Sequence, residues 1–503
     1  MSDRKDHRWN VVLAALVGLF AFVLVRTAWL SDDAYITFRT VDNFVNGYGL
    51  RWNVAERVQT YTHPLWLMLV TVPYAITREA YFTPIVLQMI LAMTTVAILA
   101  LKVAGDVRTA GAAVLFLICS KAFVEYSTSG LENPVTHLLL ILFLAAFWRL
   151  RGDRRAVTLW LLASLLMLTR IDAGLLVIPA LIVEWRSGDR RARWRSAAIG
   201  LGPLFAWELF SVVYYGFPFP NTAYAKLQTG IASATLMKQG LLYFADGLKQ
   251  DPVTLLVTVS VSAAALAFHR KTAWPIVAGI SLYYLYIVRI GGDFMTGRFL
   301  SAPLLCAVAL FAHLAWPRLN RLMPAFAAIV IVLGMFKTTR PPLTSNSTTF
   351  ILSARDGMGI SGVADERAFY YRYTGLLRWT RAIPLPHYGQ EVRGRAARAE
   401  GRAVRVESSV GLFGFFAGPE VHIVDPLGVG DALLARQPAL PGWRIGHFQR
   451  TIPEGYVPSI ETGENKIYDS TMALQYERLK TVTQGPLWTR RRWRVIRQLN
   501  LGW

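Results

Sequence analysis

The stretch SDDAYITFR, residues 31–39, directly follows the first long apolar segment of the chain, which runs from about Trp9 to Leu30. That segment is long enough to cross a bilayer, so Asp32 and Asp33 stand where a helix leaves the lipid. A carboxylate that faces water at this boundary costs little. Two interpretations therefore stay open for the acid pair, an ordinary interfacial helix cap and a functional site.

Residues 34–46 favour an amphipathic helix that lies along the membrane surface and holds the acid pair at the water boundary. Arg39, Asp42 and Asn43 fall on its polar side. Gly47 and Gly49 are expected to end it.

Composition indicates the class of protein. The 503-residue chain is 54% hydrophobic and contains many apolar runs, which is typical of a polytopic membrane protein. We expect the formal net charge of +21 in cytoplasmic loops near anionic headgroups, and no motif suggests a nucleic-acid partner. Cys119 and Cys306 lie far apart in apolar runs, which does not suggest a disulfide framework. The N-terminal segment is predicted to be a retained anchor.

Loop charges predict the orientation. Basic connections at 149–155, 186–195, 269–271 and 318–321 belong in the cytoplasm with the N-terminus, by the positive-inside rule. This works only if the short apolar run Pro64–Ile76 is a re-entrant or surface-lying helix. The prediction is about eleven crossings, with the N-terminus inside and the C-terminus outside.

The composition changes near Thr338, after which no apolar run reaches membrane-spanning length. We predict a membrane domain over residues 1–337, with its first outer loop at 31–63, and a small extracytoplasmic α/β domain over residues 338–503. The basic tail Arg490–Arg497 is expected to lie on a membrane surface.

Four segments of the predicted outer domain have a clear pattern. Val404–Ser408 and Val421–Val424 are typical of strands, and the glycine-rich stretch Gly411–Gly418 between them is interpreted as a turn. Arg367–Trp379 and Tyr468–Lys480 are expected to be helices.

The predicted topology gathers unusual polar residues on the outer side. Ionisable groups at membrane level are costly, so their convergence at one mouth favours a site. These residues are Asp32, Asp33, His63, Glu132, Arg170, Asp172, Asn221, Tyr224, Lys226, Asp293 and Arg298.

Two cations in this set are suited to phosphate. Lys226 follows a proline-stiffened aromatic stretch, and Arg298 ends the glycine-rich turn GGDFMTGRF at 291–299. For Arg170, pairing with Asp172 is as good an interpretation as ligand binding. Glu132 is equally explained by its place at the first turn of a helix.

Two further patterns leave alternatives open. DPLGVGD at 425–431 is either a strand-to-helix turn with Asp431 as a cap or a loop that closes over the site. Asp32 and Asp33 with His63 could bind a divalent cation, although their spacing is not diagnostic. No P-loop, Rossmann, zinc or serine-nucleophile motif is present.

Several of these stretches together resemble the GT-C glycosyltransferases, and within them the branch of the mycobacterial terminal β-arabinofuranosyltransferases of arabinan. The resemblance covers most of the chain, although the C-terminal domain is smaller than in the longer mycobacterial members. The matching stretches are 31–39, NGYGL at 46–50, Asn53, ERV at 56–58, YTHPLW at 61–66, TSGLE at 128–132, LTRID at 168–172, NTAYAK at 221–226, GGDFMTGRF at 291–299 and DPLGVGD at 425–431.

The resemblance implies an inverting transferase on the outer face of the bacterial cytoplasmic membrane. Its donor would be a sugar on a decaprenyl- or undecaprenyl-phosphate carrier, and its acceptor a glycan or glycoprotein hydroxyl. Arabinofuranose is the expected sugar, with mannose as the alternative. A lipid or glycan transporter is the rival from another class, which would carry paired half-helices near the bilayer midplane.

Residue roles follow from the resemblance and from the chemistry of an inverting transfer. Asp33 or Asp32 would be the base, with Asp33 slightly favoured. Lys226, Arg298 and Arg170 would bind the donor phosphate. The expected contacts to sugar and acceptor are Tyr61, His63, Glu132, Asn221, Tyr224 and Asp293.

Overall fold

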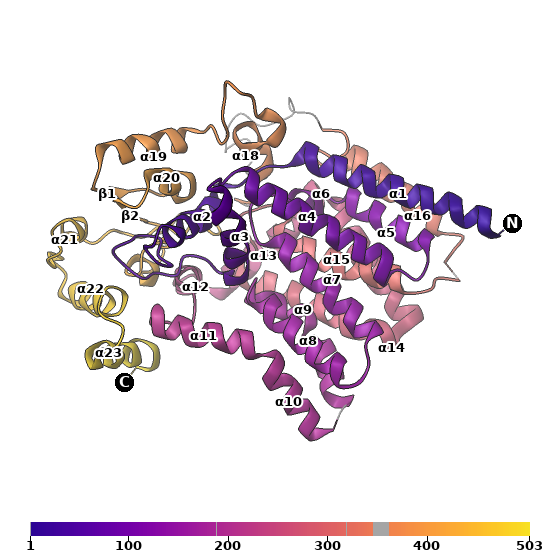
Figure 1. Cartoon of the computed structure of the whole chain (residues 1–503), viewed down its shortest axis with the longest axis horizontal. Coiled ribbons are helices and arrows are strands. Elements are labelled where there is room, and N and C mark those ends of the chain that lie inside the picture. Colours follow the sequence, from indigo (N-terminus) through magenta and orange to yellow (C-terminus); the bar gives the residue numbers. More distant parts are fainter. Residues whose placement is uncertain (1, 188, 318, 346–361, 503) are drawn as a thin grey trace. The chain divides into compact units, whose positions relative to one another are not determined.

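The computed structural model describes residues 2–187, 189–317, 319–345 and 362–502 (Figure 1). Parts of two predicted basic loops, at residues 188 and 318, and part of the predicted outer domain, residues 346–361, lie outside the described residues.

The chain forms two compact units, each built from three separate segments. The first unit consists of residues 1–31, 81–203 and 233–385, and the second of residues 32–80, 204–232 and 386–503. The units therefore do not divide the chain at the predicted boundary between residues 337 and 338.

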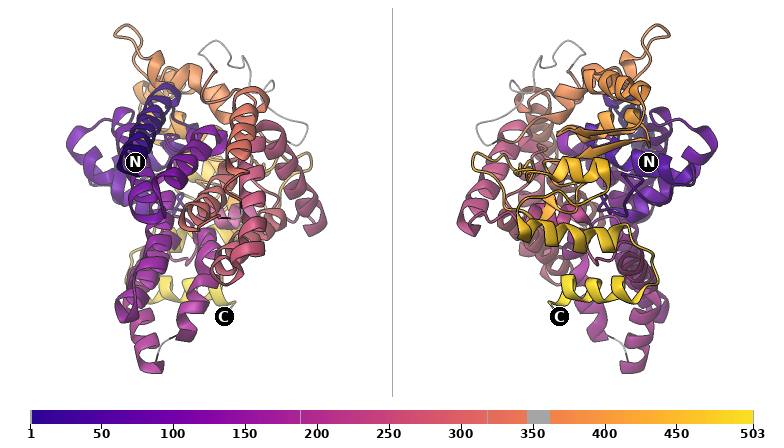
Figure 2. Two further views of the ribbon diagram at one scale, coloured as in Figure 1. Left: turned by 90° about the vertical axis from the view of Figure 1, so that its right-hand side faces the viewer. Right: turned by 90° about the vertical axis from the view of Figure 1, so that its left-hand side faces the viewer.

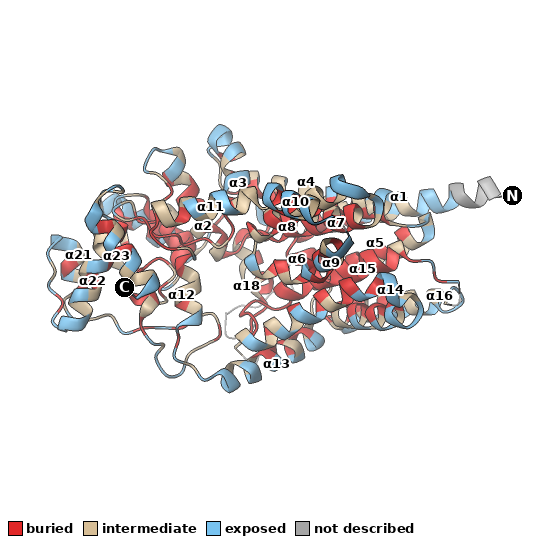
Figure 3. Cartoon of the chain, turned by 90° about the horizontal axis from the view of Figure 1, so that it is seen from below, coloured by how far each residue is buried: buried red, intermediate tan, exposed pale blue. Residues whose placement is uncertain are grey.

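The first unit is made of helices around a buried central one. The central helix, α15, is buried from Ser301 to Ala312, and α5, α7 and α14 pack against it (Figure 3). The helices of this unit are α1 (Ser2–Thr27), α4 (Phe82–Ile98), α5 (Val107–Cys119), α6 (Lys121–Glu125), α7 (Asn133–Arg149), α8 (Gly152–Met167), α9 (Gly174–Ser187), α10 (Arg190–Gly200), α13 (Ser233–Gln250), α14 (Pro252–Ile290), α15 (Ser301–His313), α16 (Met323–Val332) and α18 (Glu366–Thr374).

Several helices are long and apolar enough to cross a membrane. Among the described residues these are Arg8–Thr27, Phe82–Val103 and Pro252–Ile290, and Arg190–Gly200 with Gly202–Tyr214 counts as a fourth if the two are taken together. Shorter apolar helices of 10–17 residues accompany them, including α3 (Pro64–Thr77). The polytopic character that the composition predicts agrees with these helices, whereas the eleven crossings and the re-entrant placement of α3 stay predictions.

The second unit contains a small sheet among short helices. Strands β1 (Ala403–Val406) and β2 (Val421–Val424) pair in parallel, with Ala403 opposite Val421. The remaining elements are α2 (Asp32–Val45), α3, α11 (Gly202–Tyr214), α12 (Asn221–Leu227), α19 (Gly389–Glu400), α20 (Val410–Ala417), α21 (Tyr456–Thr462), α22 (Ser470–Thr483) and α23 (Arg490–Leu501).

The predicted glycine-rich turn at 411–418 is wrong, because this stretch forms helix α20. Its glycines serve close packing instead of a turn. A Cβ on Gly411 would lie 1.9 Å from the carbonyl oxygen of Asp32 in α2, and one on Gly414 would lie 3.2 Å from the ring of Trp52. The predicted strand at 421–424 and the helices near 367–379 and 468–480 are confirmed, with small shifts at their ends.

Helix α2 is buried on the side that was predicted to be polar. Arg39 is only 2% exposed, and its guanidinium donates to the carbonyl oxygens of Trp52, at 2.7 Å, and Val421, at 2.8 Å. Asn43 is also buried and donates to Trp52. The assignment of Arg39 and Asn43 to an exposed polar face is therefore wrong, because buried backbone carbonyls must find donors and these side chains supply them.

Candidate active site

Asp32 begins α2 and meets the N-terminal end of α20. Its carboxylate accepts the backbone N–H of Leu412 at 2.8 Å and that of Gly411 at 3.2 Å. These amides are the positive end of the α20 helix dipole. Burial raises the pKa of Asp32 to about 6, and the neighbouring charge of Asp33 adds to this, while the two amides oppose it. The carboxylate of Asp32 is thus fixed by the fold.

Asp33 lies in the same first turn of α2 but in a different environment. Successive residues of a helix point in directions about 100° apart, so the two carboxylates cannot share one partner surface. Asp33 is partly exposed, whereas Asp32 is buried. Of the acid pair, Asp33 is therefore the carboxylate that retains accessible surface for a substrate.

Tyr61 and His63 are held by residues of the second unit. His63 Nε2 lies 2.8 Å from the hydroxyl of Thr37 on α2, and the Tyr61 hydroxyl lies 2.7 Å from that of Tyr215. Tyr61 is 1% exposed and His63 is 7% exposed. Both side chains stiffen the segment that leads into α3, and any contact with a sugar would be made by groups that already have protein partners.

Helix α12 carries Asn221, Tyr224 and Lys226. Asn221 Nδ2 donates to the carbonyl oxygens of Gly428, Val429 and Asp431, so it ties the start of α12 to the DPLGVGD loop. The backbone N–H of Asn221 also donates to Gln59 at 2.8 Å. Lys226 lies in the last turn of α12 and is partly exposed.

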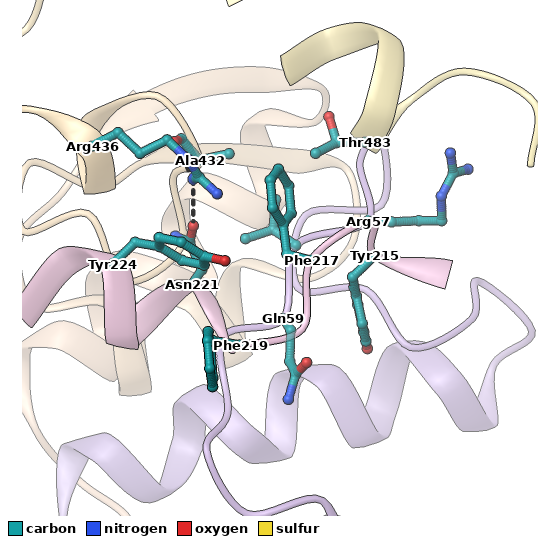
Figure 4. Close-up of a pocket in the computed structure, with 11 residues that line it drawn as sticks. Arg57, Gln59, Tyr215, Phe217, Phe219, Asn221, Tyr224, Ala432, Arg436 and Thr483 are labelled. Carbon is teal, nitrogen blue, oxygen red and sulfur yellow. Dashed lines mark hydrogen bonds between the residues drawn. The ribbon is translucent and has the colours of Figure 1, made fainter. Parts of the chain in front are cut away.

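A small pocket opens beside α12 (Figure 4). The guanidinium of Arg436 lies 4.3 Å from the ring centres of both Phe217 and Tyr224, and it donates to Asn221 Oδ1 at 3.2 Å. Tyr224 and Asn221, both predicted to contact sugar or acceptor, therefore line one pocket and share one cation.

The DPLGVGD loop is organised by its two aspartates. Asp425 accepts the backbone N–H groups of Leu427, Val429 and Gly430, and Asp431 accepts those of Leu433 and Leu434. Asp431 thus binds backbone amides just before the short helical turn Leu434–Arg436, whose N-cap residue is Leu433. The alternative, a loop that closes over the site, stays a prediction.

In the first unit, Glu132 bridges two of the predicted phosphate ligands, Arg170 and Arg298. Its carboxylate is 0% exposed and accepts hydrogen bonds from Arg298, at 2.9 Å, and from Arg170, at 3.0 Å. Arg170 also pairs with Asp172 at 2.7 Å, which confirms that predicted pairing, and Arg298 lies 3.6 Å from Asp293. The predicted residues of this unit thus form one buried cluster, in which Glu132 is shared between two guanidinium groups.

The predicted site residues are therefore divided between the two units. Glu132, Arg170, Asp293 and Arg298 belong to the first unit. The second unit holds Asp32, Asp33, Tyr61, His63, Asn221, Tyr224 and Lys226.

Sequence reasoning missed a second buried charge network in the first unit. Lys121 pairs with Glu125 at 2.5 Å and with Asp365 at 3.0 Å, and Arg367 pairs with Glu125 at 3.0 Å. The signal was present in the sequence, because Lys121 and Glu125 are charged residues four positions apart, as on one face of a helix.

Glu56 belongs to one of the stretches that carry the resemblance, but it was not among the predicted site residues. It lies near Asn53 and 3.9 Å from His422, and burial together with the charge of Asp431 raises its pKa to about 8.

The described residues contain no group of three or more His, Cys, Asp or Glu side chains arranged to hold a metal ion. The oxygens of Asp32 accept backbone amides, and His63 Nε2 lies within hydrogen-bond distance of the Thr37 hydroxyl. The predicted divalent cation stays a prediction, and no step below uses it.

Comparison with known proteins supports the resemblance found in the sequence. No family model matches the chain. Curated relatives from Mycobacterium tuberculosis and Corynebacterium glutamicum, both named terminal beta-(1->2)-arabinofuranosyltransferase, are 24% and 23% identical. The first similarity covers 89% of this chain and 84% of the relative, and the second covers 93% and 81%.

Two solved structures share the fold. ArnT from Cupriavidus metallidurans, bound to undecaprenyl phosphate, matches with a TM-score of 0.52 and 15% identity, over 84% of this chain and 88% of ArnT. The Archaeoglobus fulgidus oligosaccharyltransferase, in complex with Zn and sulfate, matches with a TM-score of 0.51 and 13% identity over 82% of this chain. The chain spans only 62% of that longer protein.

The chain shares the fold of these two structures, and its similarity to the curated relatives identifies a glycosyltransferase whose apolar helices suggest a membrane-embedded protein. Among glycosyltransferases, the chain is similar over most of its length to proteins named terminal beta-(1->2)-arabinofuranosyltransferase.

Proposed function

We propose that the enzyme transfers arabinofuranose from a polyprenyl-phosphate carrier to a hydroxyl group of a glycan or glycoconjugate. The names of the curated relatives support the sugar, and the undecaprenyl phosphate bound to ArnT supports the class of carrier. The reaction takes place on the outer face of the cytoplasmic membrane, in a chain that crosses it about eleven times. The loop charges support this orientation.

One observation carries the residue assignment, namely the contrast between Asp32 and Asp33. Asp32 is buried and bound by two backbone amides, whereas Asp33 is partly exposed in the same turn. A general base needs access to the proton that it removes. Asp33 is accordingly the base, and Asp32 is a positioning residue that fixes the start of α2.

The reaction is a single inverting displacement. Asp33 takes the proton of the acceptor hydroxyl as its oxygen bonds to the anomeric carbon, and the bond from that carbon to the carrier phosphate breaks on the opposite face. Polyprenyl phosphate leaves with the electron pair. The protein must therefore hold one carboxylate on the acceptor side and positive charge on the phosphate side.

Lys226 is our first candidate for the phosphate, because it is partly exposed at the end of α12. A lysine at a helix end suits a phosphate as a compact point charge. Arg298 and Arg170 keep their proposed role as further phosphate ligands. Glu132, originally expected to contact the sugar, is better suited to orient these two guanidinium groups.

The test is transfer by the purified full chain from radiolabelled decaprenyl-phosphate arabinofuranose, with a polyprenyl-phosphate mannose as the competing donor. Asp33→Asn should lower the rate by about 10²- to 10⁴-fold, the usual contribution of a general base, while leaving donor binding intact. Asp32→Asn should lower the rate less and lower the melting temperature, because the amide cannot accept from both backbone groups as the carboxylate does.

Full activity of Asp33→Asn would remove the assigned base. Preference for the mannose donor would replace the assigned sugar while leaving the site assignment intact. No transfer from either donor, with transport of lipid-linked sugar across vesicles instead, would favour the transporter.

A further inference from the structure

Helix α23 carries a stripe of exposed arginines. Arg490, Arg491, Arg494 and Arg497 are exposed, and their spacing places them along one side of the helix. The opposite side, with Arg492, Val495 and Ile496, is buried in the second unit against neighbours that include α22 (Figure 2). The stripe is therefore held outward by an anchored helix.

These four charges have no acidic neighbour nearby in the sequence. Residues 484–503 contain no aspartate or glutamate. Within the described ranges, none of the four arginines forms an ion pair. Like charges on neighbouring turns repel one another, so this face is stabilised by an anionic partner.

Two tryptophans accompany the stripe. Trp488 is 75% exposed, and its ring stacks with that of Trp493 at 6.3 Å between centres. Such amphipathic rings are enriched where lipid headgroups meet water. Arginine and tryptophan together fit a lipid surface better than they fit a soluble anion.

The anchor of α23 is the end of an apolar helix. Arg492 donates to the carbonyl oxygens of Val213, at 2.8 Å, and Tyr214, at 3.1 Å, the last residues of α11. Phe205 and Leu209 of α11 are 65% and 68% exposed, which is expected of a lipid-facing surface. The stripe is thus fastened at the point where an apolar helix ends.

We propose that α23 lies on the bilayer surface and binds the headgroups of anionic phospholipids through Arg490, Arg491, Arg494 and Arg497. This contact docks the C-terminal part of the second unit on the membrane. It is independent of the proposed reaction, because none of these four residues belongs to the site described above. Each arginine near an anionic surface should strengthen the contact by about fivefold, from about 1 kcal/mol per basic residue.

The test measures hydrogen exchange of α23 in the full chain, reconstituted in nanodiscs of phosphatidylcholine alone or mixed with phosphatidylglycerol. Arg494→Gln/Arg497→Gln removes two charges from the stripe. Lys466→Gln/Arg478→Gln removes two exposed charges elsewhere in the second unit and is the matched control. Protection should rise with phosphatidylglycerol and fall in high salt. For the α23 amides of the stripe variant, the increase in protection caused by phosphatidylglycerol should be about 25-fold smaller than in the wild type, from two arginines at about fivefold each. The control variant should show the same increase as the wild type.

Equal protection in both lipids, or equal protection of the stripe variant and the control, would overturn the proposal. Protection brought about by a soluble acidic polymer but not by phosphatidylglycerol would also overturn it, because the partner would then not be a lipid. Circular dichroism and the melting temperature of the stripe variant separate a lost contact from a lost helix, since its buried anchor residues are unchanged.

Discussion

The contact between Gly411 and Asp32 offers a sharp test of how the fold positions Asp33. In Gly411→Ala the new Cβ would lie 1.9 Å from the carbonyl oxygen of Asp32 and 2.9 Å from its Cγ. Neither α2 nor α20 can relieve this by rotating a side chain, because the closest atoms are backbone. To reach an ordinary contact of 3.4 Å, the two helices must move apart by about 1.5 Å.

Two consequences of this displacement can be estimated. Overpacking of this kind costs about 1–3 kcal/mol, which lowers the melting temperature of the enzyme. A catalytic group misplaced by about 1 Å loses about 10²-fold in rate. We therefore expect Gly411→Ala to lower kcat by about 10²-fold, whereas KM for the donor changes little if donor binding depends on α12.

The matched control is Gly389→Ala, at the first residue of α19 in the same unit. No atom lies within 4 Å of a Cβ built there, so this variant should keep wild-type activity and stability. Steady-state transfer and thermal unfolding are measured for both variants. Equal activity of the two alanine variants would refute the argument that close packing of α20 on α2 positions the base.

Two further predictions concern the second unit. Burial raises the pKa of Glu56 from 4.5 to about 8, so folding binds a proton between these values and stability falls as pH rises through that window. The raised pKa of Asp32 affects stability only up to about pH 6, so between pH 6 and 8 the effect of Glu56 can be separated from that of Asp32. Glu56→Gln should therefore reduce the fall in melting temperature between pH 6 and 8. An unchanged dependence of the melting temperature on pH would contradict the raised pKa of the Glu56 carboxyl. Lys226→Gln should weaken donor binding by about tenfold, as expected for a lost charged hydrogen bond, while Asp33→Asn should leave donor binding intact. Equal donor affinity of the wild type and Lys226→Gln would remove Lys226 from the phosphate site.

The local elements were largely predictable because their signals are local. Strand Val421–Val424 has β-branched residues at every position except His422, and the helix at Ser470–Thr483 follows a capping Asp469. Gly411–Gly418 was mistaken for a turn because glycine is a common turn former. Its glycines instead allow another backbone to approach, and only the tertiary structure shows which one.

Buried polar groups were the hardest to place from the sequence. Arg39 looks like a solvated residue on an amphipathic helix, yet it is buried and donates to the carbonyl oxygens of Trp52 and of the distant Val421. The pairing of Arg170 with Asp172 was predictable, because the two are neighbours in one turn. That Glu132 joins Arg170 to Arg298 was not predictable, since Arg298 lies 166 residues from Glu132 in the sequence.

The second unit is assembled from three segments that the ribosome delivers at very different times. Residues 32–80 emerge early, yet Asp32 obtains its amide partners only when residues 411–412 have been made. The carboxylate of Asp32 therefore lacks these two hydrogen bonds through most of translation. A chain that ends before α20 would keep its N-terminal apolar helices but lack the two amides that bind Asp32. A truncation late in the gene therefore disturbs a site whose acid pair is encoded near its start.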